Sequence, residues 1–290
     1  MSDKPRLGYL GIGLMGEGMT RRLLECGWQV TVWNRSPGRL ETVVPYGATA
    51  APTPAAVAQA CDILLVCVLH TQAVEEAVFG PNGVIEAESA PKLLIDHSTM
   101  DPAATRRFAE KLRQAKGTGW VDAPISGGPD AARVGKMTVM AGGSQTDIDA
   151  ARPVMADLAA NYTRMGDVGA GQTTKLVNQL IVGTGFVVMA EALRLAEEAG
   201  IDAAALPGCL AGGFADSAIL QRLYPQMQAR AFEPPKSYSR QLLKDLHAVA
   251  GFAAELGLDL PMIKTAESRY KHHVAAGYAM RDSASIIETT

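Results

Sequence analysis

The chain has 290 residues, of which 48% are hydrophobic and 20% charged, and its formal net charge is −3. This composition is typical of a globular protein with one large domain or two ordinary ones. A small negative charge without dense Lys/Arg runs argues against a basic surface for nucleic acid or lipid headgroups. The chain begins without an apolar signal core, and its longest apolar stretch carries polar residues near one end. We therefore expect a cytoplasmic protein with no nucleic-acid and no membrane partner.

Short β-rich runs alternate with helical patterns along the first half of the chain. The run at 62–68 is continuously apolar, which is typical of a strand buried on both faces of a parallel sheet. Strand and helix in alternation predict an α/β fold with a Rossmann-type doubly wound parallel sheet and helices on both faces. The predicted strands span 6–10, 29–33, 62–68, 92–96 and 120–122, and the predicted helices include 19–26, 101–114 and 147–160.

The strand signal disappears in the second half of the chain. Nothing between about 170 and 199 breaks a helix except Gly183 and Gly185, which a long helix tolerates. One helix far longer than the mean of about 11–12 residues is therefore predicted there. We predict a dinucleotide-binding domain over residues 1–166 and an all-helical domain over 167–290. Further helical patterns in the second domain span 242–256 and 261–276.

A glycine motif, Gly11-x-Gly13-x-x-Gly16, follows the first predicted strand and opens a helix. In that position Gly11 permits the tight turn, Gly13 lets the backbone approach a pyrophosphate, and Gly16 lets the helix pack close to the sheet. The free N–H groups at the helix N-terminus then bind the phosphates. A glycine-rich turn without a ligand is the alternative. The residues of the predicted dinucleotide loop are Gly11, Ile12, Gly13, Leu14, Met15 and Gly16.

The end of the second strand distinguishes between the two nicotinamide cofactors. An NAD site usually places Asp or Glu there to hold the ribose hydroxyls, whereas this chain has Asn34, Arg35 and Ser36. The Arg35 guanidinium and its small polar neighbours can hold a 2′-phosphate, which no carboxylate repels. NADP is therefore favoured over NAD, with a plain surface charge as the alternative interpretation of Arg35.

A second glycine turn, Ser126-Gly127-Gly128, follows the predicted strand at 120–122. Consecutive N–H groups in such a turn can converge on an anion, as in a backbone nest. The natural occupant is the carboxylate of a small substrate. An ordinary glycine-rich turn is the alternative.

A polar cluster lies near the start of the predicted long helix. Lys175 is three residues from Asn178 and four from Gln179, so these side chains leave one side of the helix. Reducing an aldehyde requires a hydride from the nicotinamide and a proton for the developing alkoxide. A lysine beside the carbonyl oxygen supplies the proton and stabilises the charge, so Lys175 is the predicted general acid and base. Asn178 and Gln179 either contact the substrate or are satisfied interior amides.

Four motifs follow one another along the chain. They are Gly11-x-Gly13-x-Met15-Gly16, Asp122-Ala-Pro-Ile-Ser-Gly-Gly128, Gly169-x-Gly171-x-x-x-Lys175-x-x-Asn178 and Lys244-Asp245-Leu246. In this order they resemble the β-hydroxyacid dehydrogenase family, which includes 3-hydroxyisobutyrate dehydrogenase and tartronate semialdehyde reductase. The resemblance spans nearly the whole chain. It implies an N-terminal Rossmann domain, a long interdomain helix and an all-α C-terminal domain for substrate binding and oligomerisation. It also implies assembly into a homodimer or homotetramer.

The same resemblance assigns roles to individual residues. It makes Lys175 the catalytic lysine, with the turn at 126–128 holding the substrate carboxylate. Asn178 would orient the substrate, and Gln179 stands where the commoner family sequence has a second Asn and is also predicted to bind substrate. Contacts with the cofactor are implied for Val68, Leu69, Ser98, Thr99 and Lys244.

The predicted activity is NAD(P)-dependent, reversible hydride transfer to or from a small β-hydroxy acid or its semialdehyde. Gln179 is similar to the tartronate semialdehyde reductase branch, whereas Asn34-Arg35-Ser36 is closer to NADP-using glyoxylate and succinic semialdehyde reductases. The particular carboxylate therefore stays open. One alternative is an imine reductase on the same architecture, although such enzymes generally lack a lysine at the Lys175 position. Another is a catalytically inactive cofactor-binding module.

No metal site is predicted. His272 and His273 are adjacent, so on a helix they point in different directions. His97 is predicted to be a core or cofactor-loop histidine rather than a catalytic base. The cysteines lack C-x-x-C spacing and fit buried thiols. They are Cys26, Cys61, Cys67 and Cys209.

Overall fold

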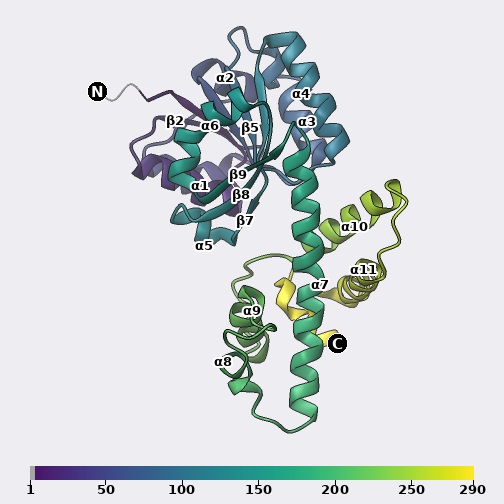
Figure 1. Cartoon of the computed structure of the whole chain (residues 1–290). Coiled ribbons are helices and arrows are strands. Elements are labelled where there is room, and N and C mark those ends of the chain that lie inside the picture. Colours follow the sequence, from purple (N-terminus) through teal and green to yellow (C-terminus); the bar gives the residue numbers. More distant parts are fainter. Residues whose placement is uncertain (1–3) are drawn as a thin grey trace. The chain divides into compact units, whose positions relative to one another are not determined.

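The computed structural model describes residues 4–290 (Figure 1). The chain divides into two compact units, Met1–Lys175 and Leu176–Thr290. The division falls inside helix α7 (Ala170–Glu198), whose first turns up to Lys175 belong to the first unit. The predicted long helix at 170–199 is confirmed by α7, and the predicted domain limit after residue 166 lies just before it.

The first unit is built on a nine-stranded, mostly parallel sheet. Its strands are β1 (Leu7–Leu10), β2 (Val30–Trp33), β3 (Thr49–Ala50), β4 (Ile63–Val66), β5 (Leu93–Asp96), β6 (Gly119–Asp122), β7 (Ile125–Ser126), β8 (Met137–Gly142) and β9 (Ala159–Gly166). The order is β3-β2-β1-β4-β5-β6-β8-β7, and β9 pairs with β8. Because β1 pairs in parallel with both β2 and β4, the chain crosses from one side of β1 to the other after β3. Open α/β sheets bind their ligands at such a crossover.

Helices cover both faces of this sheet. They include α1 (Leu14–Glu25), α2 (Pro54–Ala60), α3 (Thr71–Phe79), α4 (Pro102–Lys116) and α6 (Gln145–Leu158). Successive strand side chains point to opposite faces. Leu64 accordingly packs in a core with α2, α3 and α4, while Leu65 packs in a core with α1 and α6. Figure 1 shows the strands between α1 and α6 on one side and α3 and α4 on the other. The predicted doubly wound α/β fold is confirmed.

One edge of the sheet departs from the parallel pattern. β8 runs antiparallel to β6 and β7, and a short helix, α5 (Gly128–Arg133), connects β7 to β8. The helix predicted at 147–160 ends at Leu158, because Ala159 already begins β9. Most of β9 is exposed, so its residues show no apolar alternation. Pairing with β8 makes this segment a strand, which its sequence alone did not indicate.

The second unit is helical, and within its described residues it carries no strand longer than one isolated bridge. Besides most of α7 it contains α8 (Leu206–Cys209), α9 (Ala218–Gln228), α10 (Ser239–Glu255) and α11 (Pro261–His273). Its core gathers apolar side chains from α7, α9, α10 and α11. A Cβ on Gly183 would overlap the buried side chain of Leu246, so this glycine allows α10 to approach α7 closely. The predicted all-α character of this part is confirmed.

Candidate active site

Most of the residues predicted to bind the cofactor come together at one edge of the sheet. β1, β2, β4 and β5 are adjacent parallel strands, so their carboxyl ends meet at the same edge. The glycine loop follows β1, the 34–36 segment follows β2, Val68 and Leu69 follow β4, and Ser98 and Thr99 follow β5. Nucleotides bind at this edge in open parallel sheets.

The glycine loop has the shape that a dinucleotide requires. Gly11 has φ +99°, and a Cβ there would overlap the carbonyl oxygen of Cys67. A Cβ on Gly16 would overlap the carbonyl oxygen of Gly11, so α1 packs against the turn only because both residues are glycine. Among residues 4–290, no atom lies within 4 Å of a Cβ built on Gly13, and no side chain caps α1. The first N–H groups of α1 can therefore bind phosphate.

In the segment after β2, Asn34 is bonded to the glycine loop, whereas Arg35 is exposed. The side-chain oxygen of Asn34 accepts a hydrogen bond from the Ile12 N–H at 2.8 Å, and its Nδ2 donates to the Ser36 carbonyl at 2.8 Å. The Asn34 amide thus joins the glycine loop to the segment after β2. The Arg35 side chain is 79% exposed and lies 3.9 Å from the Glu76 carboxylate. An exposed pair at that distance contributes little stability, so the Arg35 guanidinium can turn toward a phosphate.

The segments after β4 and β5 are bonded to each other. The Ser98 hydroxyl oxygen accepts from the Val68 N–H at 3.0 Å, and the Ser98 N–H donates to an Asp96 carboxylate oxygen at 2.9 Å. Ser98 is buried, whereas Leu69 is 45% exposed and Thr99 half-buried. The hydroxyl of Ser98 therefore holds the loop, and the exposed atoms of this region come from its neighbours.

The predicted lysine lies beside the predicted substrate turn. Lys175 is only 8% exposed, and its Nζ donates to the Ile125 carbonyl oxygen at 2.8 Å. Ile125 immediately precedes the turn at 126–128, in which Gly127 has φ +131° and Gly128 φ +74°. Two segments separated by fifty positions in sequence thus place an amine next to a glycine turn.

Two buried carboxylates end the neighbouring strands. Asp122, the last residue of β6, accepts from the N–H of Gly169 at 2.8 Å and of Gln172 at 2.9 Å, and so caps the start of α7 from outside the helix. Burial raises the pKa of Asp122 to about 6, although these N–H bonds act in the opposite direction. Burial also raises the pKa of Asp96, at the end of β5, to about 7.

From the sequence, Asp122 was recognised only as part of a motif, and no role was predicted for Gln172. A role for Asp122 could have been predicted from its place at the end of a short apolar strand, because a buried carboxylate there requires hydrogen-bond partners. His97, predicted to be a core or loop histidine, is 2% exposed, and its Nδ1 donates to the Ala123 carbonyl at 2.7 Å. Burial lowers the pKa of His97 to about 4, so its ring is neutral and joins the ends of β5 and β6.

In the second unit, a chain of polar groups runs from α7 to α10. The Asn178 Nδ2 donates to the Gln179 side-chain oxygen at 2.8 Å, and the Gln179 Nε2 donates to Asp245 at 2.6 Å. The other Asp245 oxygen is 3.0 Å from the Lys244 Nζ. A carboxylate only accepts hydrogen bonds, which sets the direction of the chain. Gln179 uses both ends of its amide on protein groups, as expected for an interior amide.

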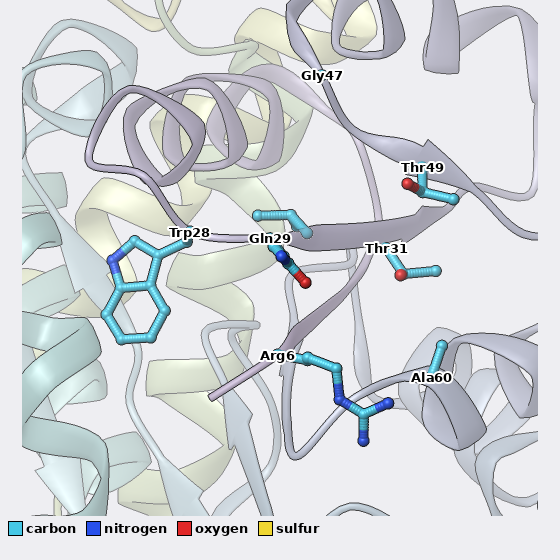
Figure 2. A pocket seen from close by; sticks show the side chains of 8 residues that line it. Arg6, Trp28, Gln29, Thr31, Gly47, Thr49 and Ala60 are labelled. Carbon is cyan, nitrogen blue, oxygen red and sulfur yellow. The ribbon is translucent and has the colours of Figure 1, made fainter. Parts of the chain in front are cut away.

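A pocket of about 220 Å³ opens at the opposite edge of the sheet (Figure 2). It is lined by Arg6, Trp28, Gln29, Val30, Thr31, Gly47, Thr49 and Ala60. Arg6 and Gln29 precede β1 and β2, so this is the amino-terminal edge, and the Arg6 guanidinium is paired with Asp62 at 3.1 Å. The pocket contains no residue of the predicted site.

Within residues 4–290, no group of three or more His, Cys, Asp or Glu side chains could hold a metal ion. The two nitrogens of His273 lie 2.8 Å from the Thr289 hydroxyl and 2.9 Å from the Ser285 hydroxyl. Cys61 is buried, as predicted, but the prediction is wrong for Cys209, which is exposed because it ends the short surface helix α8.

Comparison with known proteins identifies the class of this fold and site. Residues 6–166 match the family model described as the NAD binding domain of 6-phosphogluconate dehydrogenase. Residues 169–290 match the model described as NAD-binding of NADP-dependent 3-hydroxyisobutyrate dehydrogenase. The chain is thus an NAD(P)-dependent oxidoreductase. The 2-hydroxy-3-oxopropionate reductase of Escherichia coli (strain K12) is 34% identical over 283 residues, covering 98% of this chain and 96% of that protein. The chain belongs to the β-hydroxyacid dehydrogenase family, as its motifs predicted.

Solved structures agree with this assignment. The crystal structure of 3-hydroxyisobutyrate dehydrogenase from Salmonella typhimurium superposes with a TM-score of 0.89 at 29% identity, covering 99% of this chain and 100% of that one. An imine reductase from Pseudomonas sp. has a TM-score of 0.67 at 22% identity, which shows a shared fold alone. Among further relatives, L-threonate dehydrogenase of Cupriavidus necator is 29% identical over 97% of this chain and 95% of that protein.

Proposed function

We propose that the protein catalyses reversible hydride transfer between NADP(H) and a small β-hydroxy acid or its semialdehyde, with Lys175 as general acid and base. The observation that carries this proposal is the 2.8 Å hydrogen bond from the Lys175 Nζ to the Ile125 carbonyl. It brings a buried amine to the residue that precedes the 126–128 turn. The proposed proton donor and the proposed anion-binding turn therefore lie close together in the same unit.

The chain's own groups supply binding and proton transfer, while the nicotinamide, when bound, supplies or accepts the hydride. N–H groups of the turn formed by Ser126, Gly127 and Gly128 hold the substrate carboxylate. The Lys175 ammonium donates a proton to the carbonyl oxygen during reduction and takes it back during oxidation. Its charge also stabilises the developing alkoxide. The hydrogen bond to the Ile125 carbonyl orients the ammonium group beside the 126–128 turn.

Polar residues further along the chain complete the proposal. Asn178, one turn beyond Lys175 on α7, orients the substrate through its side-chain amide. Gln179 belongs to the substrate site through its bond to Asn178, and Lys244 contacts the cofactor. The hydrogen bonds from Asn178 through Gln179 to Asp245 support a fixed orientation of the Asn178 amide.

The cofactor preference follows from the segment after β2. The loop at 11–16 holds the pyrophosphate, Asn34 supports that loop, and Arg35 and Ser36 bind the 2′-phosphate of NADP. Val68, Leu69 and Thr99 would contact the cofactor, and the buried Ser98 would support that contact through its hydrogen bond with the Val68 N–H. Replacing Arg35 by Glu introduces a charge that repels the 2′-phosphate, and we expect the ratio of kcat/KM for NADPH over NADH to fall about tenfold to a hundredfold. Arg107→Glu, on the exposed face of α4, is the matched control. An unchanged ratio in Arg35→Glu would contradict the NADP preference.

Names of the relatives support small hydroxy acids as substrates. They include a 2-hydroxy-3-oxopropionate reductase and an L-threonate dehydrogenase, and one similar structure is a 3-hydroxyisobutyrate dehydrogenase. We propose a three- to four-carbon acid of this kind, with a hydroxyl or aldehyde on the β-carbon. Cytoplasmic location is part of the same proposal.

Nicotinamide absorbance with a panel of short semialdehydes and β-hydroxy acids tests the reaction. We expect turnover of at least one acid and a fall in kcat of about 10²–10⁴-fold in Lys175→Met, the range of general acid–base catalysis. Lys92→Met, an exposed lysine of the same unit, is the matched control. Full activity of Lys175→Met would refute the lysine mechanism. A wild type that reduces only cyclic imines would favour an imine reductase, and one that binds cofactor without any turnover would favour an inactive module.

We further propose that two copies of the chain associate through α7. Four apolar side chains on this helix are exposed by 43–72%: Val177, Ile181, Val188 and Leu195. They are four, seven and seven residues apart, which places them along one face at the spacing of a coiled-coil seam. By length and composition α7 could also cross a membrane, but the core helix of a soluble protein passes the same test. The same row on α7 of a second copy could pack against these four side chains, as in a coiled coil.

A further inference from the structure

We propose that Gln172 is a positioning residue that holds the predicted cofactor loop and Lys175 in a fixed relation, an inference that rests on the proposed function. Gln172 is completely buried, and both ends of its amide are bonded to one loop. Its side-chain oxygen accepts from the Met100 N–H at 2.9 Å, and its Nε2 donates to the Ser98 carbonyl at 2.7 Å.

A space-filling role does not explain this residue. Burying an amide is unfavourable unless its hydrogen bonds are made, and an apolar side chain of similar volume would fill the same space at lower cost. The two bonds join segments that are seventy or more positions apart, from α7 to the loop after β5. Ser98 in this loop is also bonded to the Val68 N–H, so Gln172 is linked through Ser98 to a second segment predicted to contact the cofactor.

The main chain at Gln172 is fixed as well. Its N–H donates to Asp122 at 2.9 Å, beside the bond from Gly169 to the same carboxylate. The first turn of α7 is therefore bonded to the end of β6 through Asp122 and to the loop after β5 through the Gln172 side chain. These contacts leave the start of α7 little freedom to tilt or slide.

Lys175 lies three residues further along this helix, so a shift of the Gln172 turn moves it too. Its Nζ is bonded to the Ile125 carbonyl, next to the substrate turn. Gln172 thus links the loop predicted to contact the cofactor, which would supply the hydride, to the helix that carries the proposed proton donor. Transfer of either requires close alignment, and a misplacement of about 1 Å can cost about 10²-fold in rate.

The test compares Gln172→Leu, which keeps the volume and removes both side-chain bonds, with Thr118→Val. Thr118 is also completely buried in this unit, and its hydroxyl donates to the Pro91 carbonyl at 2.7 Å near the amino-terminal edge of the sheet. The control therefore removes a buried hydrogen bond away from the site. We expect kcat to fall about 10²-fold in Gln172→Leu, with KM and the dissociation constant of NADP changed less than about threefold. Thr118→Val keeps its kcat within about twofold.

A second measurement, hydrogen exchange, tests the bonds of Gln172 in the absence of cofactor and substrate. In the cofactor-free protein, hydrogen exchange at the Met100 amide accelerates in Gln172→Leu, because its acceptor is gone, and stays unchanged in Thr118→Val. Gln172→Glu is the rescue variant. Its protonated acid can reproduce both bonds whereas its carboxylate cannot, and burial favours the protonated form, so its kcat is near that of wild type at low pH and falls relative to wild type as the introduced carboxyl ionises at higher pH. Asp96, Asp122 and His97 have shifted pKa values in both proteins, so the profile of the variant is compared with that of wild type over the same pH range.

A wild-type kcat in folded Gln172→Leu, or unchanged exchange at Met100, would overturn the inference. So would an equal loss of kcat in the Thr118→Val control. If Gln172→Leu does not fold, the pH profile of Gln172→Glu decides, and a profile parallel to that of wild type overturns the inference. An inactive wild type refutes the proposed function and this inference together, whereas active wild type, inactive Lys175→Met and fully active Gln172→Leu refute only the positioning role.

Discussion

Two stretches of α7, residues 170–175 and 177–195, depart in opposite ways from the usual pattern of buried apolar and exposed polar side chains. Between Ala170 and Lys175 the helix buries polar groups, with Gln172 completely buried. Further along it exposes apolar groups, with Ile181 59% and Leu195 72% exposed. A buried polar group requires hydrogen-bond partners, and an exposed apolar row favours an apolar partner. The polar groups of the first stretch have hydrogen-bond partners within the chain, whereas the apolar side chains of the second are not covered by other residues that the structure describes. One helix thus carries part of the proposed active site and the proposed docking surface.

The largest expected effect comes from removing the carboxylate that holds the first stretch. Asp122→Ala leaves the N–H groups of Gly169 and Gln172 without their acceptor in a buried place. Each such group costs about 1–3 kcal/mol, so we expect the free energy of unfolding to fall by about 3 kcal/mol, measured by urea denaturation at pH 7. Asp149→Ala, on the exposed face of α6, should change it by less than about 0.5 kcal/mol. Equal losses in both variants would mean that the cap on α7 contributes little.

The second stretch is tested by a charge in its exposed row. In Ile181→Asp a carboxylate would be buried where two copies meet, and we expect the dimer dissociation constant to rise about a hundredfold or more. Light scattering over a concentration series measures this change. Arg194→Ala, which removes an exposed polar side chain of the same helix, is the control. If the wild type is a monomer at every concentration, or if Ile181→Asp dimerises as well as wild type, the row does not bind a second copy.

The smallest expected effect concerns the pH dependence of the buried carboxylates near the start of α7. Burial raises the pKa of Asp96 to about 7 and that of Asp122 to about 6, above the value of about 4 in an unfolded chain. Between those values the folded protein binds more protons than the unfolded one, so their contribution to stability falls as pH rises from about 4 to 7. Asp96→Asn keeps the acceptor for the Ser98 N–H and removes this charge.

We therefore expect Asp96→Asn to be more stable than wild type at pH 8, by on the order of 1–3 kcal/mol, and to lose that advantage at pH 4.5. Urea denaturation of both proteins at the two pH values measures the difference. A constant difference between the two proteins across this range would show that Asp96 titrates near its ordinary value.

Much of the first unit could be predicted from local patterns. Continuous apolar runs such as 62–68 identified the parallel strands, and the glycine loop at 11–16 stood between a strand and a helix. β9 could not be found this way, because its exposed residues carry no period and only pairing with β8 makes it a strand. The prediction that Cys209 is buried was wrong for a related reason, because its exposure depends on where the short helix α8 lies in the fold.

The candidate site could be predicted as a set of residues but not as an arrangement. Lys175 and the turn at 126–128 were identified separately, and their closeness follows from the sheet order and from how α7 packs at the end of β6. The roles of Asp122 and Gln172 were missed because each depends on the N–H or carbonyl groups of a distant segment. A sequence pattern contains no information on which distant backbone group a side chain will meet.

The sequence by itself therefore determined the family, the two kinds of secondary structure and the loops with unusual backbone conformations, because periodicity and glycine positions are local properties. Only the tertiary structure decided that the Lys175 amine is held by a carbonyl beside the 126–128 turn, and that Asp122 and Gln172 tie the start of α7 to two strand ends. Those bonds form because folding buries polar groups that must then find partners, and the partners are set by the order of strands in the sheet.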